Sequence, residues 1–233
     1  MLFRSTNYNG FHVSCYGWND GMASASANGA IPPYNFWWSS GSETSNSGSL
    51  PAGYVSVYAT DSQHCDTVSM QLELIQPESI HLLQQDVSDY NGYGVSCPEA
   101  SDGWLSAEAG GGVAPLQYMW SNNVGSQQNS GIAAGTHTLE VTDFNNCDET
   151  FEFEVTEPSA LDIQPLIISD TCLKSVGSID INPIGGAGST ISELNGEMVG
   201  EEICCMLAGA YNLQLTDING CSMQFVIDVP NVP

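Results

Sequence analysis

Pairs of cysteines recur along this chain at a nearly fixed spacing. In each pair the second cysteine follows the first by 49 or 50 residues and ends the pattern Asp-x-x-x-Cys. The first cysteines of successive pairs also recur at a similar interval, which indicates three tandem copies of one structural unit. We therefore predict three domains, called repeats 1, 2 and 3 below, at residues 1–78, 79–159 and 160–233. The pairs are Cys15 and Cys65, Cys97 and Cys147, and Cys172 and Cys221.

Units of this size need more than a hydrophobic core. A domain of about 75–80 residues buries only about 60% of the surface of its unfolded chain. A disulfide that closes a loop of about 50 residues adds about 4 kcal/mol in the chain-entropy model. We therefore expect each pair to form a disulfide within its own repeat. Such bonds persist in oxidising compartments, so the expected location is extracellular, at the cell surface.

Repeat 3 contains two further cysteines, the adjacent residues Cys204 and Cys205. Glycine and serine occupy the corresponding positions of repeats 1 and 2. The pair could form a vicinal disulfide, remain as thiols, bridge to another chain or take Cys172 away from Cys221. The sequence leaves these alternatives open.

Short segments of alternating apolar and polar residues fill each repeat. Residues 104–109, 136–141, 179–182 and 211–215 show this alternation, which is typical of strands. Glycine and proline turns separate such segments about every 8–12 residues, and helical periodicity is absent. Tyr211, near the start of a late segment, is placed like a tyrosine corner. The fold prediction is therefore all-β, with three tandem Ig-like β-sandwich domains.

Tryptophans mark an aromatic segment that follows proline in repeats 1 and 2. With a period of two, Trp38 and Trp120 share a face with other apolar residues, so we expect both in the core. Trp37 falls on the opposite face. Trp18, Trp37 and Trp104 are candidates for stacking on sugar rings if they are exposed. Core packing and contacts between repeats are the alternative explanations for each.

The order of several short motifs resembles a known family. The motifs are Val-Ser-Cys, Asn-Asp-Gly, Pro-Pro-Tyr-x-x-x-Trp-Ser, Leu-Pro-Ala-Gly-x-x-x-Val, Thr-Asp-x-x-x-Cys and Glu-Pro. This order resembles the SprB-type repeat of giant cell-surface and gliding-motility adhesins of Bacteroidetes. Repeat 3 departs from it: residues 174–177 replace the Asn-Asp-Gly turn, and no tryptophan follows Gly185 and Gly186. The resemblance implies secretion, surface display and a role in adhesion or gliding, and it implies no catalytic residues.

The chain is strongly acidic. It has 27 aspartates and glutamates against two cations, Arg4 and Lys174, and its formal net charge is −25. Without a cationic patch it cannot follow a phosphate backbone, which excludes nucleic-acid binding as a main activity and argues against anionic lipid surfaces. The charge either keeps a self-repelling surface in solution or attracts divalent cations, and both roles can hold together.

Aspartates at repeated positions are the candidates for a cation site. Asp20 and Asp61 lie near the two cysteines of repeat 1, Asp102 and Asp143 hold the same places in repeat 2, and Asp217 holds the second place in repeat 3. If a disulfide joins these segments, each pair of carboxylates comes within reach of one Ca²⁺, which takes about six to eight oxygen ligands. The alternative is that each aspartate caps its own turn by accepting backbone N–H groups. Calcium is the one expected cofactor.

Signatures of enzymes and of membrane spans are absent from the sequence. The four histidines are not spaced as metal ligands on a helix, and no nucleophile-elbow or phosphate-loop motif occurs. No stretch of 18 apolar residues occurs, and the first residues lack the apolar core of a signal peptide. We therefore expect a mature or excised part of a longer secreted protein. The histidines are His12, His64, His81 and His137.

The expected function is that of a non-enzymatic extracellular module of a large bacterial surface adhesin, acting as a stiff acidic spacer or adhesive rod. Its expected partners are neighbouring repeats of the same or identical chains, together with surface glycans or other surface proteins. One alternative is a subunit that self-assembles into an extracellular filament or sheath, through strand exchange at repeat 1 or cross-links at Cys204 and Cys205. A further alternative is a carbohydrate-binding module.

Overall fold

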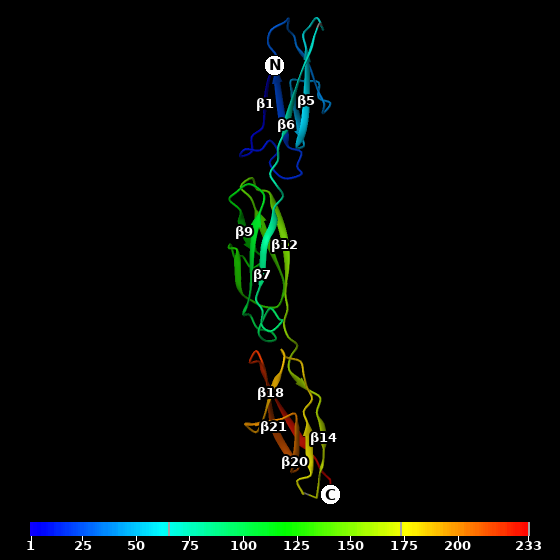
Figure 1. The fold of residues 1–233 in the computed structure, drawn as a ribbon, viewed down its shortest axis with the longest axis vertical. Coiled ribbons are helices and arrows are strands. Elements are labelled where there is room, and N and C mark those ends of the chain that lie inside the picture. The colour runs from blue at the N-terminus through cyan, green and yellow to red at the C-terminus, as the bar shows by residue number, and fades with distance from the viewer. Residues whose placement is uncertain (65, 173, 233) are drawn as a thin grey trace. The chain divides into compact units, whose positions relative to one another are not determined.

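All the regular secondary structure in the computed structural model is β-strand, over the residues that it describes: 1–64, 66–172 and 174–232 (Figure 1). The chain forms two compact units. Unit 1 consists of residues 1–84, 108–126 and 139–151, and unit 2 consists of residues 85–107, 127–138 and 152–233. The boundary between the units runs through strands of repeat 2. The predicted domain limits therefore stay a prediction.

Repeat 1, in unit 1, forms two three-stranded antiparallel sheets. Its strands are β1 (Leu2–Ser5), β2 (Gly21–Ser26), β3 (Asn35–Trp38), β4 (Asn46–Leu50), β5 (Gly53–Thr60) and β6 (Thr67–Leu74). The sheet orders are β1-β2-β4 and β3-β5-β6, and Figure 1 shows β5 and β6 side by side. Lettered by the Ig scheme, these are A-B-E and C-F-G sheets, the arrangement of an Ig-like sandwich without strand D.

Repeat 2 has the same topology. Its strands are β7 (His81–Val87), β8 (Gly103–Gly110), β9 (Gln117–Trp120), β10 (Gln128–Ile132), β11 (Gly135–Thr142) and β12 (Asp148–Val155). The sheet orders are β7-β8-β10 and β9-β11-β12. Along β8 buried and more exposed residues alternate, as the sequence pattern predicts for a strand with one face on a core.

Repeat 3, in unit 2, keeps this arrangement with additions. Its main sheets are β14-β16-β20 and β19-β18-β21-β22, so one extra strand joins the second sheet. These strands are β14 (Leu166–Ile168), β16 (Gly177–Asp180), β18 (Thr190–Leu194), β19 (Glu197–Val199), β20 (Glu202–Met206), β21 (Gly209–Asp217) and β22 (Ser222–Val229). Two short pairs complete it: β13 (Asp162–Ile163) with β17 (Pro183–Ile184), and β15 (Asp170–Thr171) with β23 (Asn231–Val232). The all-β, Ig-like prediction is confirmed.

Each outer repeat has a core between its two sheets. In repeat 1 the core joins Trp38 of β3 to small and branched residues of the other strands, and Trp38 donates its indole N–H to Thr44 O at 2.8 Å. Trp120 of repeat 2 is also buried and makes the equivalent bond to Ser126 O at 2.8 Å. The prediction that both tryptophans belong to the core is confirmed. The core of repeat 3 contains Leu161, Ile179, Ile181, Leu194, Met206, Leu213, Leu215, Ile227 and Val229.

A polar corner precedes the long strand F of repeats 2 and 3. The Tyr211 hydroxyl donates to Leu207 O, four residues earlier, at 2.8 Å, which is the hydrogen bond of a tyrosine corner. In repeat 2 a histidine takes the same place, with His137 Nε2 2.9 Å from Ala133 O. The tyrosine-corner prediction is confirmed, and repeat 2 makes the same contact with a different side chain.

Among the described residues, no helix has the length and apolar character needed to cross a membrane.

Candidate functional site

Two disulfides among the described residues join consecutive repeats. Cys15 of repeat 1 bonds to Cys147 of repeat 2, with 5.7 Å between the Cα atoms. Cys97 of repeat 2 bonds to Cys221 of repeat 3, with a Cα separation of 5.6 Å. The first bond lies within unit 1 and the second within unit 2. We call their surroundings the first junction and the second junction.

The prediction of a disulfide within each repeat is therefore wrong. The bonds Cys15–Cys65, Cys97–Cys147 and Cys172–Cys221 are replaced by the two bonds above, and Cys172 is a free, exposed thiol. Cys65 lies outside the described residues.

The reason for the error is the length of strand F. In repeat 3, Cys172 precedes β16, whose first residue Gly177 pairs with Met206, close to where β21 begins. The Asp-x-x-x-Cys turn follows the other end of β21, and nine residues of strand span about 30 Å. A disulfide needs Cα atoms within about 7 Å of each other. Cys172 and Cys221 therefore belong to opposite ends of the sandwich.

An asparagine of the Asp-x-x-x-Cys turn makes the closest polar contacts of the first junction. The Asn145 side-chain amide donates to Ser14 O, the carbonyl just before Cys15, at 2.8 Å. Asn9 Nδ2 donates in turn to Asn145 Oδ1 at 2.6 Å. The disulfide and these two hydrogen bonds hold the turn of repeat 2 against the loops of repeat 1.

The second junction repeats this geometry with equivalent residues. The Asn219 side-chain amide donates to Ser96 O at 2.9 Å and to Tyr90 O at 3.1 Å. Asn91 donates to Asn219 Oδ1, as Asn9 does to Asn145. The chain therefore builds the same joint twice, from residues that occupy the same places in successive repeats.

A buried aspartate shapes each of these turns. The Asp143 carboxylate accepts backbone N–H groups from Asn145 and Cys147 on one oxygen and from Val113 on the other, at 2.8–2.9 Å. Asp217 does the same with Asn219, Cys221 and Ala187, at 2.8–3.0 Å. Each carboxylate thus ties its turn to the glycine loop that precedes strand C.

Glycines bring that loop against the segment that links two repeats. Gly111 has a φ of +80°, and a Cβ there would overlap the carbonyl oxygen of Ser79. Gly185 has a φ of +77°, and its Cβ would overlap the carbonyl oxygen of Ala160. The linker backbone is therefore too close for any side chain, and only glycine fits both the space and the conformation.

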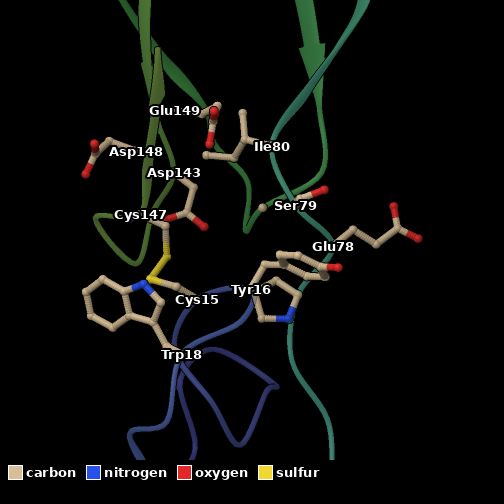
Figure 2. A pocket seen from close by; sticks show the side chains of 12 residues that line it. Cys15, Tyr16, Trp18, Glu78, Ser79, Ile80, Asp143, Cys147, Asp148 and Glu149 are labelled. Atoms are coloured by element: carbon tan, nitrogen blue, oxygen red, sulfur yellow. Dashed lines mark hydrogen bonds between the residues drawn. A yellow bond between two sulfur atoms is a disulfide. The ribbon is translucent and has the colours of Figure 1, made fainter. Parts of the chain in front are cut away.

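The first junction contains a pocket of about 300 Å³ (Figure 2). It is lined by the disulfide, by Tyr16 and Trp18, and by carboxylates that include Glu78 and Glu149. Trp18 is 55% exposed, so its ring is open to solvent. A pocket of about 530 Å³ lies at the corresponding place of the second junction, and its lining includes Cys97, Cys221, Glu99, Leu161 and Met223.

The remaining candidate aspartates also accept hydrogen bonds from their own loops. Asp20 accepts from Ser14 N at 3.0 Å, Asp102 from Ser96 N at 3.1 Å, and Asp61 from Gln63 N at 3.0 Å. Hydrogen bonds from the Ser96 side chain and backbone lower the pKa of Asp102, because they stabilise its ionised form. These contacts are the turn caps of the alternative hypothesis.

The pairing of Asp20 with Asp61 assumed a disulfide between Cys15 and Cys65, and Cys15 bonds to Cys147 instead. Among the described residues, no group of three or more His, Cys, Asp or Glu side chains is placed to hold a metal ion. Calcium binding by Asp20, Asp61, Asp102, Asp143 and Asp217 stays a prediction.

The candidate tryptophans differ in their surroundings. Trp37 stacks on Tyr58 across β3 and β5, with ring centroids 5.5 Å apart and an interplanar angle of 9°. Trp104 is half-buried in β8. Trp18 alone among these three is exposed and lines a pocket.

The adjacent cysteines of repeat 3 are free thiols in β20. Cys204 and Cys205 are exposed, and their sulfur atoms lie 3.3 Å apart. The hydrogen bond with Cys204 raises the pKa of the Cys205 thiol, because it stabilises the protonated form.

Sequence reasoning missed Asn145, Asn219 and the two glycine loops as parts of a site. The available signal was the recurrence of an asparagine two positions before the second cysteine, together with a glycine pair ahead of strand C. Such residues are equally typical of turns within a single repeat, so the pattern alone does not point to a junction.

Comparison with known proteins finds a family model that matches part of repeat 1. Residues 12–43 match the family model of the SprB repeat. These residues run from just before Cys15, through β2 and β3. They include the Val-Ser-Cys, Asn-Asp-Gly and Pro-Pro-Tyr-x-x-x-Trp-Ser motifs of repeat 1. A search of curated proteins returned no match.

Solved structures of adhesion and immune proteins show distant likeness. They include the eight N-terminal Ig domains of Down syndrome cell adhesion molecule (9% identity, 81% of this chain, 30% of that chain, TM-score 0.40). A C-terminal intimin fragment bound to the intimin-binding domain of Tir also matches, with 15% identity over 70% of this chain and 66% of that chain and a TM-score of 0.36. The insect immune protein hemolin is a third, with 13% identity over 77% of this chain and 56% of that chain and a TM-score of 0.29. The chain spans 30% of the length of the first of these structures and 66% of the length of the second.

Proposed function

We propose that this chain is a non-catalytic extracellular module of a bacterial surface adhesin, in which disulfide junctions carry load between successive Ig-like repeats. One observation supports this most directly: the same joint, with its disulfide, asparagine, aspartate and glycine loop, occurs twice. A feature built twice at equivalent places belongs to the repeat architecture, and disulfides agree with an oxidising location.

The route of tension through the chain explains why such a joint suits an adhesin. A pull on the ends enters repeat 1 at its first residues and passes through the Cys15–Cys147 bond directly into repeat 2. The linker residues 77–80 are bypassed, as are strands β2 to β6. The short linker between repeats 1 and 2 therefore carries none of the tension while the disulfide is intact.

The acidic surface supports a spacer role. A formal net charge of −25 on 233 residues makes neighbouring chains repel one another, which favours separated modules at the cell surface. The same charge disfavours adhesion to other anionic surfaces at low salt.

Cell display under flow tests the adhesive part of this proposal. Non-adherent cells that display the chain should be retained on glass, hydrophobic polymer or polysaccharide-coated surfaces more strongly than cells that display an unrelated Ig-like domain at equal density. If both kinds of cell were retained equally on each of the three surfaces, the chain would be a spacer without adhesive function.

A carbohydrate-binding role is the second candidate, supported by the pocket of the first junction. Exposed Trp18 and neighbouring Tyr16 offer ring faces, and Glu78 and Glu149 offer acceptors for sugar hydroxyls. Glycan-array binding that disappears in Trp18→Ala and persists in Trp37→Ala would place a sugar at this pocket. No binding to any glycan would exclude the role for the sugars on the array.

Calcium is retained as a proposal, carried by the acidic composition and the repeated aspartates. Asp61→Asn keeps an oxygen that can accept the Gln63 N–H group, so a turn cap should survive it. A calcium site should lose most of its affinity, which calorimetric titration of both forms would measure. If titration of calcium into the original chain and into Asp61→Asn gave no binding heat, this proposal would be wrong.

A further inference from the structure

Cys204 and Cys205 lie in a β-bulge of strand β20. The residues on either side of them pair with Gly177 and Ile179 of β16, which leaves two residues of β20 opposite one residue of β16. Cys205 has a φ of +61°, in the left-handed region. Bulges with one residue in this region bend the strand and change the direction of the neighbouring side chains.

The bulge brings the two sulfur atoms together. In a regular strand, neighbouring side chains point to opposite faces of the sheet. Here the Cys205 thiol donates to Cys204 Sγ, with 3.3 Å between the sulfur atoms, and both side chains are exposed. In addition, β20 is an end strand of the β14-β16-β20 sheet. Solvent and solutes therefore meet the two thiols as one unit with two sulfur atoms.

The same bulge occurs in repeats 1 and 2 without cysteines. The register shifts at the equivalent places of β4 and β10, and the second residue of the bulge is Ser49 in repeat 1 and Gly131 in repeat 2. These residues have φ values of +55° and +71°. Glycine adopts this region freely, whereas cysteine is not among the residues enriched there. The bulge therefore does not require cysteines, and their presence in repeat 3 points to a chemical role.

A disulfide between these two neighbours does not suit the backbone. Adjacent Cα atoms lie about 3.8 Å apart across a trans peptide, whereas the Cα atoms of a disulfide usually lie about 4.4–6.8 Å apart. A disulfide outside this range is strained and easily reduced. The position therefore favours two thiols, which is the state that the structure has.

We propose that Cys204 and Cys205 together chelate one soft metal ion, of the class that includes Zn²⁺ and Cd²⁺. Thiolates are preferred ligands of such ions, and the ion takes the place of the two thiol protons, which pass to solvent. The remaining positions of the ion face solvent. The net charge of −25 assists by raising the concentration of cations near the chain. This site is separate from the repeated aspartates and independent of an adhesive role.

The separation of the sulfur atoms indicates which coordination geometry fits. With metal–sulfur bonds of about 2.3 Å, two sulfurs 3.3 Å apart subtend an angle of about 92° at the ion. A tetrahedral ion needs the sulfurs about 3.8 Å apart, which a small rotation of the side chains provides. A linear two-coordinate ion needs about 4.6 Å, so the sulfurs would have to separate by about 1.3 Å. The pair therefore suits tetrahedral ions better than linear ones.

The test uses Cd²⁺ as the probe and the full chain with Cys65→Ser and Cys172→Ser. In that chain Cys204 and Cys205 are the only cysteines outside the two disulfides. Intact mass should show that iodoacetamide adds to both thiols without metal and to neither after one equivalent of Cd²⁺. Thiolate-to-metal charge-transfer absorption in the ultraviolet should appear at the same time. A large excess of Ca²⁺ should not reverse either effect, because Ca²⁺ prefers oxygen ligands.

Single variants distinguish chelation from binding by one thiol. Cys204→Ser and Cys205→Ser each keep one exposed thiol, and each should weaken Cd²⁺ binding by more than about tenfold. Loss of an outer-shell partner of a metal ligand already costs about 10–100-fold, and here a ligand itself is lost. Retention of both disulfides between repeats shows that the variants are folded.

The bulge of repeat 1 offers a gain-of-function control. Gly48→Cys with Ser49→Cys places two thiols in that bulge, in a chain whose own pair in β20 is replaced by serine. A Cβ on Gly48 would meet only Met22 Cγ, at 3.7 Å, which is an ordinary contact. This transplanted pair should restore Cd²⁺ binding, because the bulge sets the geometry of the two sulfurs.

Four outcomes would overturn the proposal. The first two are a purified chain whose two thiols are already joined to each other or to another chain, and free thiols that Cd²⁺ does not protect. The others are single variants that bind Cd²⁺ as tightly as the chain with both thiols, and a folded transplant that binds none. Each would leave the two junctions, and the function proposed from them, unaffected.

Discussion

Aspartates act at the residue scale as organisers of backbone turns. Asp143 and Asp217 each accept three backbone N–H groups while buried, and Asp170 does so from a different position. The acidic composition is therefore in part structural, since some of the charge is used to hold loops.

The glycine loop provides a matched pair of substitutions. Gly111→Ala and Gly29→Ala place alanine at nearly the same positive φ, which costs about 1–2 kcal/mol in each. Only at Gly111 does the new Cβ overlap a carbonyl, that of Ser79, and relief of this overlap should cost about 1–3 kcal/mol more. Urea unfolding of both variants measures the difference, and equal losses would mean that the linker is not held against the loop.

The lowered pKa of Asp102 predicts a pH-dependent contribution to stability. A carboxyl group whose pKa is lower in the folded than in the unfolded chain stabilises the fold above its ordinary pKa near 4, and this is lost as the pH falls through the lowered value. Asp102→Asn should therefore be less stable than the original chain at pH 7, by less than about 1 kcal/mol because the group is exposed.

Urea unfolding at pH 7 and at pH 3 checks this expectation. The difference in the free energy of unfolding between the original chain and Asp102→Asn should be smaller at pH 3 than at pH 7. Glu108→Gln, which removes a charge at an exposed position of β8, serves as the control for general charge effects. If this difference in the free energy of unfolding were the same at both pH values, the ionised Asp102 would be ruled out as its source.

At the scale of elements, strands and turns follow directly from the sequence. Period-two alternation predicts β8, β11, β16 and β21, and asparagine and glycine before the last cysteine predict the hairpin between β21 and β22. These are local signals, because strand and turn preferences depend on neighbouring residues. Burial of Trp38 and Trp120 follows from the same periodicity.

Disulfide pairing could not be predicted in this way, because it is a property of where elements end in space. The regular spacing of Cys172 and Cys221 is compatible with a closed loop, yet strand β21 separates the ends of that loop. The partner of Cys15 lies in the next repeat, at a sequence separation of 132, where the same cysteine position recurs. A repeated cysteine spacing therefore fits bonds within repeats and bonds between them equally well.

Removal of the first disulfide should weaken the fold. Cys15→Ser with Cys147→Ser opens a link with a sequence separation of 132 residues, worth about 5 kcal/mol in the entropy model and about 2–5 kcal/mol in practice. Urea unfolding without reductant measures the loss. Cys172→Ser, at an exposed free thiol, should change stability by less than about 0.5 kcal/mol.

Peptide mapping of the unmodified chain gives the independent check on pairing. The chain has only Arg4 and Lys174 for trypsin, so cleavage by pepsin or at glutamate is required. A peptide that contains Cys15 joined to Cys65 would contradict the junctions.

At the scale of the whole molecule, the two disulfides divide the chain into loaded and bypassed segments. Tension follows residues 1–15, crosses to Cys147, returns along the backbone to Cys97, and crosses to Cys221 before it reaches the end. The backbone has 232 steps from one residue to the next between the two ends, and only 76 of them lie on this path. Residues 1–15 contribute 14 steps, residues 97–147 contribute 50, and residues 221–233 contribute 12. Within repeat 2 the load therefore runs between its own two cysteines, against the direction of the chain.

This route predicts how far the fully unfolded chain extends. At about 3.3–3.6 Å per residue, the oxidised chain should reach about 250–270 Å and the reduced chain about 770–840 Å. Single-molecule pulling between the two ends, in a Cys204→Ser, Cys205→Ser background, measures both lengths. Cys15→Ser with Cys147→Ser should lengthen the path to only 108 steps, about 360–390 Å, because Cys97–Cys221 still shortcuts the chain. Disulfides within each repeat would leave 183 steps in the same variant, about 600–660 Å. A length in that upper range would show that the junctions do not exist, whereas the shorter one would show that consecutive repeats are joined through them.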